Sequence, residues 1–411
     1  MIVEIIISFF FIIIFGWQLI KLSPLLLIIM CLALFTHVGI IGYSHYWAVQ
    51  QNTSGIVFDS SVDAQKYFFT AEGLSTGSLF SIEPYDITSV SGGVWHFGYY
   101  YLNIVCMKLS SDPMLLMRLI KLCSFFLVLV FVVRLWQKKY GNVATMCGLL
   151  YLTFGWWEII YYNFRNCRDG LIVSICLLIY YLCDQLEFHS SSFRFVWSRS
   201  EGSFNRYILI SLCLVLLATF RIYLAILITL SIVVHIVISS NTSLVRKFFY
   251  IVATVLISIL PFKYKFSSLV SYGSQLFVEN PGTNSYMQIA YRCFKALVAP
   301  IPWQYTHDFL ILSQFFYLIV LAISILSLVF LVRPIPWRQA VVVISLTLFL
   351  GLFVDSSYVR KRMPLVPIFT VWMVAGFSRI RTGKSLGNVY ASRIRKYPKR
   401  SFSSRFESRK T

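Results

Sequence analysis

Long runs of apolar residues, separated by short polar connections, recur along the whole chain. A run of about 20 apolar residues is long enough to cross the hydrocarbon core of a bilayer as an α-helix. The pattern therefore predicts an all-α, polytopic bundle of about 11 transmembrane helices, with external loops that carry short amphipathic helices. The predicted spans are Ile2–Leu19, Ser23–Tyr43, Pro113–Val133, Val143–Tyr162, Gly170–Cys183, Tyr207–Phe220, Ile222–Ile238, Phe248–Pro261, Leu310–Val332, Ala340–Val354 and Met363–Phe377.

Basic residues are concentrated in every second connection of this series. These connections are Arg134–Lys139, Arg194–Arg206, Arg246–Lys247, Arg333–Arg338 and the tail from Arg379. All of them fall on one side if the spans alternate, and the positive-inside rule makes that side cytoplasmic. The N-terminus is then predicted outside and the C-terminus inside.

Four regions follow from this topology. Residues 1–43 hold two N-terminal spans, and residues 44–112 form an external acidic loop. Residues 113–378 form the main bundle, with an external loop at about 263–308. The basic tail at 379–411 lacks periodicity and is expected to be disordered in the cytoplasm. Within the acidic loop, Val94–Leu109 is interpreted as an amphipathic or re-entrant helix, because a span there would reverse the side of the basic connections.

Composition excludes a water-soluble protein, since 58% of residues are hydrophobic and only 13% are charged. The net charge of +20 would indicate nucleic-acid binding in a soluble protein, but here the basic residues follow the topology. No nucleic-acid partner is therefore expected. The nine cysteines form no C-x-x-C pair, and the histidines match no metal motif. We expect no metal site and no cofactor, with at most a weak dependence on a divalent cation.

The acidic external loop supplies candidates for a catalytic carboxylate. Asp63 lies just beyond the second span, in a segment whose apolar spacing predicts a short surface helix. A carboxylate there has the position of a general base for an acceptor hydroxyl, with Asp59 as the second candidate. The alternative interpretation is that Asp63 caps the N-terminus of that helix.

Arginines occupy several of the predicted external turns. Arg165 and Arg168 are three residues apart, an arrangement that suits forked hydrogen bonds to a phosphate, or a simple ion pair with Asp169. Arg221 interrupts an apolar stretch that is too long for one span, so it and Tyr223 are predicted at an external turn. The last external link adds further cations, among them Arg360 and Arg362. Basic residues outside run against the topology rule, and an anionic lipid head group is the simplest reason for them.

The chain resembles the polytopic glycosyltransferases of the GT-C type, which use polyprenyl-phosphate-linked sugars and include protein mannosyltransferases and lipid A aminoarabinose transferases. The resemblance rests on four short motifs, Asp63-Ala-Gln-Lys-Tyr67, the aromatic Gly98-Tyr-Tyr-Tyr101, the external Arg-Asp turn, and Arg360-Lys-Arg362-Met-Pro364 before the final span. It implies that Asp63 is the base and that Arg165, Arg168, Arg221, Arg360 and Arg362 hold the lipid phosphate. Tyr67 and Tyr223 are the candidate substrate-binding residues. The resemblance also implies a bacterial cytoplasmic (inner) membrane and a role in surface polysaccharide biosynthesis. The departures are an extra span before the acidic loop and the lack of a large soluble domain after the bundle.

A second resemblance, in size, span number and Arg-rich external loops, is to O-antigen and capsular repeat-unit polymerases. Both resemblances imply a polyprenyl-phosphate-linked sugar or oligosaccharide and membrane lipid as partners. A flippase or transporter for the same lipid-linked glycan is a third possibility, and it would place charges through the midplane of the bundle. The charges here gather at one predicted face, which favours the enzyme.

Overall fold

The described part of the chain is helical throughout. The computed structural model describes residues 2–51, 62–76, 97–191, 200–238, 248, 252, 286–299, 308–331, 337–353 and 362–382, and these contain no strand. The α-helices are α1 (Ile2–Leu19), α2 (Pro24–Gln50), α3 (Val62–Leu74), α5 (Phe97–Leu109), α6 (Pro113–Tyr140), α7 (Asn142–Leu150), α8 (Trp157–Phe164), α9 (Asp169–Ser191), α10 (Ser200–Phe220), α11 (Ile222–Ile238), α14 (Tyr286–Val298), α15 (Asp308–Leu326), α16 (Trp337–Phe353) and α18 (Val366–Thr382). Short π-helical turns at Tyr151–Gly155 and Ser327–Leu331 and a 3₁₀ turn at Met363–Leu365 complete the set.

Five described helices are long and apolar enough to cross a membrane, which makes this chain a membrane protein by length and composition. They are Ile2–Leu19, Pro24–Gln50, Pro113–Tyr140, Leu310–Val329 and Met363–Ile380. A bent pair, Asn142–Gly155 with Trp157–Phe164, raises the number to six if it forms one broken span. The predicted count of about 11 is not confirmed. The predicted span Phe248–Pro261 lies almost entirely outside the described residues.

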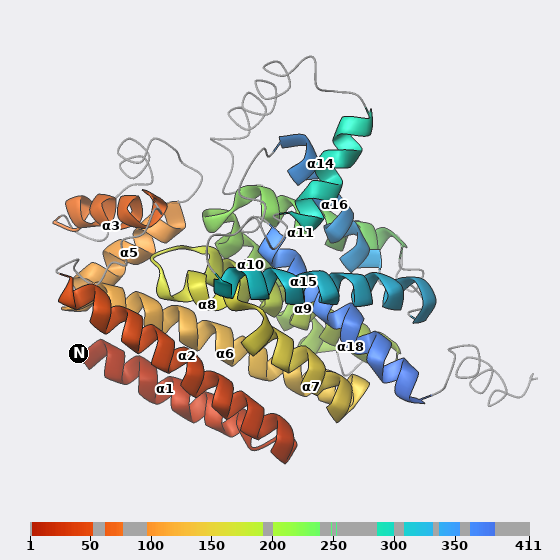
Figure 1. Ribbon diagram of the computed structural model, residues 1–411, viewed down its shortest axis with the longest axis horizontal. Coiled ribbons are helices and arrows are strands. Elements are labelled where there is room, and N and C mark those ends of the chain that lie inside the picture. The colour runs from red at the N-terminus through yellow and green to blue at the C-terminus, as the bar shows by residue number, and fades with distance from the viewer. Residues whose placement is uncertain are drawn as a thin grey trace, which may run out of the picture.

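Helix α6 forms the centre of the bundle. It packs against α1, α2, α5, α7 and α9, and its buried side chains include Phe125, Phe126 and Trp136. Figure 1 shows α1 and α2 running alongside α6 at one edge of the molecule. These two outer helices leave many large apolar side chains exposed, such as Phe9 and Phe35, as expected for helices that face lipid.

Two helix breaks position the polar residues described below. The predicted span Val143–Tyr162 is bent by 46° at Trp156, directly after the π-helical turn Tyr151–Gly155. π-Helical turns are a recognised cause of sharp kinks. The second break lies at Arg221, between α10 and α11, where the sequence predicted it.

The predicted amphipathic helix at Val94–Leu109 corresponds to α5. Only part of its aromatic surface is exposed, because Tyr99 and Tyr100 are buried while Tyr101 is exposed. α5 is enclosed by α3, α6 and α10, and an added Cβ at Gly98 would overlap Thr219 of α10. Tyr99 and Tyr100 are therefore core residues of the bundle.

Candidate functional site

The short turn between α8 and α9 brings three buried charged side chains together within five residues. Arg165 and Arg168 are only 6% and 8% exposed, and Asp169 at the start of α9 is 1% exposed. The backbone turns sharply here, and the Cys167 N–H donates to the Arg165 carbonyl over 2.8 Å. Buried charges are costly unless they are paired or hydrogen-bonded, so this turn needs support from neighbouring elements.

Two cations on α6 supply part of that support. The Arg118 guanidinium donates through Nε to the Phe164 carbonyl over 2.6 Å. The Lys121 ammonium donates to the Tyr162 carbonyl over 3.2 Å and also to the Arg165 carbonyl. The last carbonyls of a helix have no partner within it, and cations stabilise that end of the helix dipole. Arg118 and Lys121 therefore cap α8 and fix the start of the turn.

Arg118 is held in turn by an Asp–His pair. His45 at the end of α2 lies 2.7 Å from Asp112 through Nε2, and Arg118 donates to its Nδ1 over 2.5 Å. Since an arginine can only donate, Nδ1 accepts in this contact and Nε2 faces the Asp112 carboxylate. Burial alone would raise the pKa of Asp112, but hydrogen bonds from His45 and from the Leu115 N–H outweigh it and lower the pKa.

The other side of the turn is covered by α3 and α5. The Asn166 side chain donates to the Ala64 carbonyl of α3 over 3.3 Å and accepts from the Tyr99 hydroxyl of α5 over 2.8 Å. Burial raises the pKa of Tyr99, so its hydroxyl stays protonated and keeps donating. The Tyr67 ring lies 4.8 Å from the Tyr99 ring and 5.9 Å from the Arg168 guanidinium. The first turns of α3 therefore pack directly on the turn at residues 165–169, which we call the arginine turn.

Two further charged contacts of the turn are an ion pair and a cation–π contact. Arg221, from the break between α10 and α11, forms a buried ion pair with Asp169. The Arg165 guanidinium lies 3.5 Å from the centre of the Tyr161 ring, which is a cation–π contact. An added Cβ at Gly170 would overlap the Asn163 side chain, so a larger residue there requires Asn163 to move.

The structure brings together four of the residues that the sequence analysis nominated, namely Arg165, Arg168, Arg221 and Tyr67. Asp63 lies in the first turn of α3, next to Ala64, and Asp59 and Arg360 lie outside the described residues. Tyr223 is half-buried in the first turn of α11.

Arg362 belongs to a different cluster. Its guanidinium donates to the carbonyls of Leu297 over 3.1 Å and Ala299 over 2.6 Å, and to the Gln314 side chain. It also lies 4.1 Å from the centre of the Tyr317 ring. These contacts tie α14 to α15 and to the start of α18, so Arg362 does not join the arginine turn.

Sequence reasoning missed the buried groups that support the turn. Lys121 follows Arg118 by three residues inside an apolar helix, and such intramembrane cations are a recognisable signal of function. Glu158, at the start of α8, was also missed, and its buried carboxylate accepts a hydrogen bond from Ser313 of α15. Among the described residues, no group of three or more His, Cys, Asp and Glu side chains is arranged to hold a metal ion.

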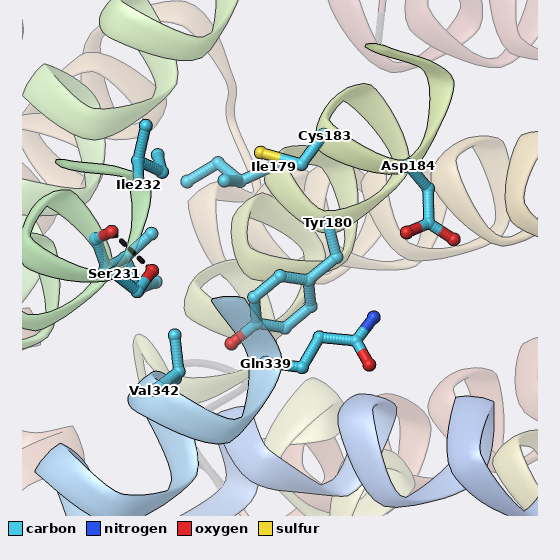
Figure 2. Close-up of a pocket in the computed structure, with 9 residues that line it drawn as sticks. Ile179, Tyr180, Cys183, Asp184, Ser231, Ile232, Gln339 and Val342 are labelled. Atoms are coloured by element: carbon cyan, nitrogen blue, oxygen red, sulfur yellow. Dashed lines mark hydrogen bonds between the residues drawn. The ribbon is translucent and has the colours of Figure 1, made fainter. Parts of the chain in front are cut away.

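A small cavity lies well away from this turn. It has a volume of about 20 Å³, room for one water molecule, and lies between α9, α11 and α16. Figure 2 shows Tyr180, Asp184 and Gln339 around it, together with Ser231. A second cavity of the same size shares Tyr180, Asp184 and Gln339. Asp184 lies roughly 22 Å from Asp169 along the axis of α9, so neither cavity adjoins the arginine turn.

Comparison with known proteins gives no match to any family model, any curated protein or any solved structure.

The capping role of Lys121 can be tested against a lysine of the same helix. Lys121→Met removes a charged donor from the Tyr162 and Arg165 carbonyls, so we expect the free energy of unfolding in detergent to fall by about 1–3 kcal/mol. The control is Lys138→Met, because Lys138 is exposed near the other end of α6. Thermal unfolding of both variants measures the effect. Equal melting temperatures for the two variants would contradict the capping role.

Proposed function

We propose that this protein is a membrane glycosyltransferase that moves a sugar from a polyprenyl-(pyro)phosphate carrier to a glycan, lipid or protein acceptor. The observation that supports it most is the docking of α3 on the arginine turn. The Ala64 carbonyl, directly after Asp63, accepts from Asn166, which lies between Arg165 and Arg168. The candidate base and the candidate phosphate ligands are about 100 residues apart in the sequence. The hydrogen bond between Asn166 and Ala64 brings the two chain segments that carry them into contact.

Arginine chemistry suits the donor head group in this proposal. The planar guanidinium presents paired N–H donors that match two phosphate oxygens, and such charge-assisted hydrogen bonds are strong. Arg165 and Arg168 come from the turn itself and have that role. Arg221 acts indirectly, because its ion pair with Asp169 holds the end of the turn in place.

Helix α3 has a second part in the proposal. Arg165 and Arg168 are almost fully buried, and the Tyr67 ring of α3 lies over Arg168. A phosphate reaches these guanidinium groups when α3 shifts away from the turn. Substrate-induced movement of a covering element that excludes water is common in enzymes.

The proposed reaction is a single displacement at the anomeric carbon. Asp63 takes the proton from an acceptor hydroxyl, and the oxygen attacks the anomeric carbon. The bond from that carbon to the phosphate oxygen breaks, and the electron pair leaves with the polyprenyl phosphate. Arg165 and Arg168 stabilise the negative charge that develops on the departing phosphate, a form of electrostatic stabilisation that usually contributes most.

The proposed setting is the outer face of a bacterial cytoplasmic membrane, with about 11 spans, the N-terminus outside and the C-terminus inside. Its support is the distribution of basic residues in the sequence, whose last 33 residues are strongly basic. The arginine turn and α3 then lie outside, where lipid-linked sugars are used. In Figure 1, α3 lies beside α5 at one end of the molecule.

Arginine-to-lysine variants test the phosphate ligands. Arg165→Lys and Arg168→Lys keep the charge but lose the planar fork, so we expect affinity for polyprenyl phosphate to fall about tenfold or more. The measurement is the rise in melting temperature that added polyprenyl phosphate produces in detergent, because a ligand of the folded state stabilises it by mass action. Arg134→Lys is the matched control, since Arg134 is bonded to Gln18 near the far end of α6. Undiminished stabilisation in both turn variants would contradict phosphate binding by the turn.

Asp63→Asn tests the base. The loss of a general base lowers transfer by roughly 10²-fold or more, whereas folding should be retained. Glu72→Gln is the control, because Glu72 is exposed on the same helix. The assay is release of polyprenyl phosphate from a polyprenyl-phosphate-linked sugar by purified protein. Near-normal turnover by Asp63→Asn would assign the role to another carboxylate, with Asp59 the first to test.

A further inference from the structure

Helix α14 exposes several large apolar side chains. Met287, Tyr291 and Phe294 are 81%, 65% and 63% exposed. Their spacing of four and three residues places them in one stripe along the helix. The opposite side of the helix, which includes the buried Ala296 and half-buried Cys293, packs the helix onto the protein, where α16 is its main neighbour. The aromatic and Met stripe therefore faces away from the bundle.

A polar and basic stripe runs beside the apolar one. Gln288, Arg292 and Lys295 repeat the same spacing one position later, which rotates them by about 100° around the helix axis. Gln288 and Lys295 are exposed, and Arg292 is half-buried. Apolar and basic stripes side by side are typical of helices that lie in the plane of a membrane surface.

The hydrogen bonds that attach α14 to the bundle indicate how deep the helix lies relative to the bilayer. The carbonyls at its C-terminal end accept hydrogen bonds from Arg362, from Gln314 over 2.8 Å and from Tyr317 over 2.8 Å. Arg362 directly precedes the candidate span Met363–Ile380, and Gln314 lies near the start of the candidate span Leu310–Val329. Because spans begin at the membrane surface, the C-terminal end of α14 is fixed near that surface.

We propose that α14 is a lipid-docking helix that lies on the bilayer surface and binds anionic lipid head groups. Met287, Tyr291 and Phe294 insert at the boundary of the acyl chains, and Lys295 and Arg292 contact the negatively charged head groups. The helix has 13 residues, a length of roughly 20 Å, which is too short to cross the hydrocarbon core. This proposal stands independently of the glycosyl-transfer proposal.

Photo-crosslinking in defined vesicles tests this assignment. The full chain, with p-benzoylphenylalanine in place of Phe294, is reconstituted in phosphatidylcholine alone or in an equal mixture with phosphatidylglycerol, illuminated, and analysed by mass spectrometry. We expect lipid adducts at position 294 and far fewer when Gln288 carries the probe. The adduct yield should rise in the anionic mixture, by up to about fivefold for each basic residue at the head groups. Lys295→Gln should remove most of the increase that one basic residue produces.

Three results would overturn the proposal. Adducts between two copies of the chain at position 294 would show that the stripe is an interface between protomers. Equal and low yields at positions 294 and 288 would show a water-exposed helix. Equal lipid adducts in the two kinds of vesicle would remove the anionic head group as the ligand.

Discussion

The capping of α8 by two buried cations is the interaction on which the rest of the candidate site depends. Helix α8 ends inside the bundle, where its last carbonyls cannot bond to water, and a buried polar group without a partner is expensive. Arg118 and Lys121 of α6 meet that need at Phe164, Tyr162 and Arg165. The central helix of the fold is in this way also the support of the charged turn.

The other parts of the site follow from this position of the turn. With α8 ended at Phe164, Asn166 faces both Ala64 and Tyr99, which brings α3 and α5 over the turn. Asp169 begins α9 and meets Arg221, so the break between α10 and α11 lies against the same turn. A buried ion pair contributes little net stability against an apolar alternative, but removal of one partner is costly. The Arg221–Asp169 pair thus holds the break between α10 and α11 against the turn.

The sequence predicted local features of this fold better than tertiary ones. The predicted bounds of the first span match α1, and the break at Arg221 was found because an apolar run too long for the bilayer must be interrupted. The 46° bend at Trp156 was not found, because hydropathy measures the average polarity of a window and carries no signal of a π-helical turn. Lys121 was overlooked for the same reason, since one cation hardly changes the mean of a strongly apolar helix. The contacts of Arg362 depend on α14, whose packing no local pattern could indicate. The count of about 11 spans stays a prediction.

The proposed topology places the arginine turn and the basic end of α6 on opposite sides of a membrane. Arg118 and Lys138 are separated by roughly 30 Å along α6, which is the thickness of the hydrocarbon core. The direct measurement is labelling of Thr76→Cys and Lys138→Cys with a membrane-impermeant maleimide, because both positions are exposed and the nine native cysteines are buried or half-buried. We expect labelling of Thr76→Cys in intact cells and of Lys138→Cys only after permeabilisation. Labelling of both positions from the same side would contradict the proposed topology.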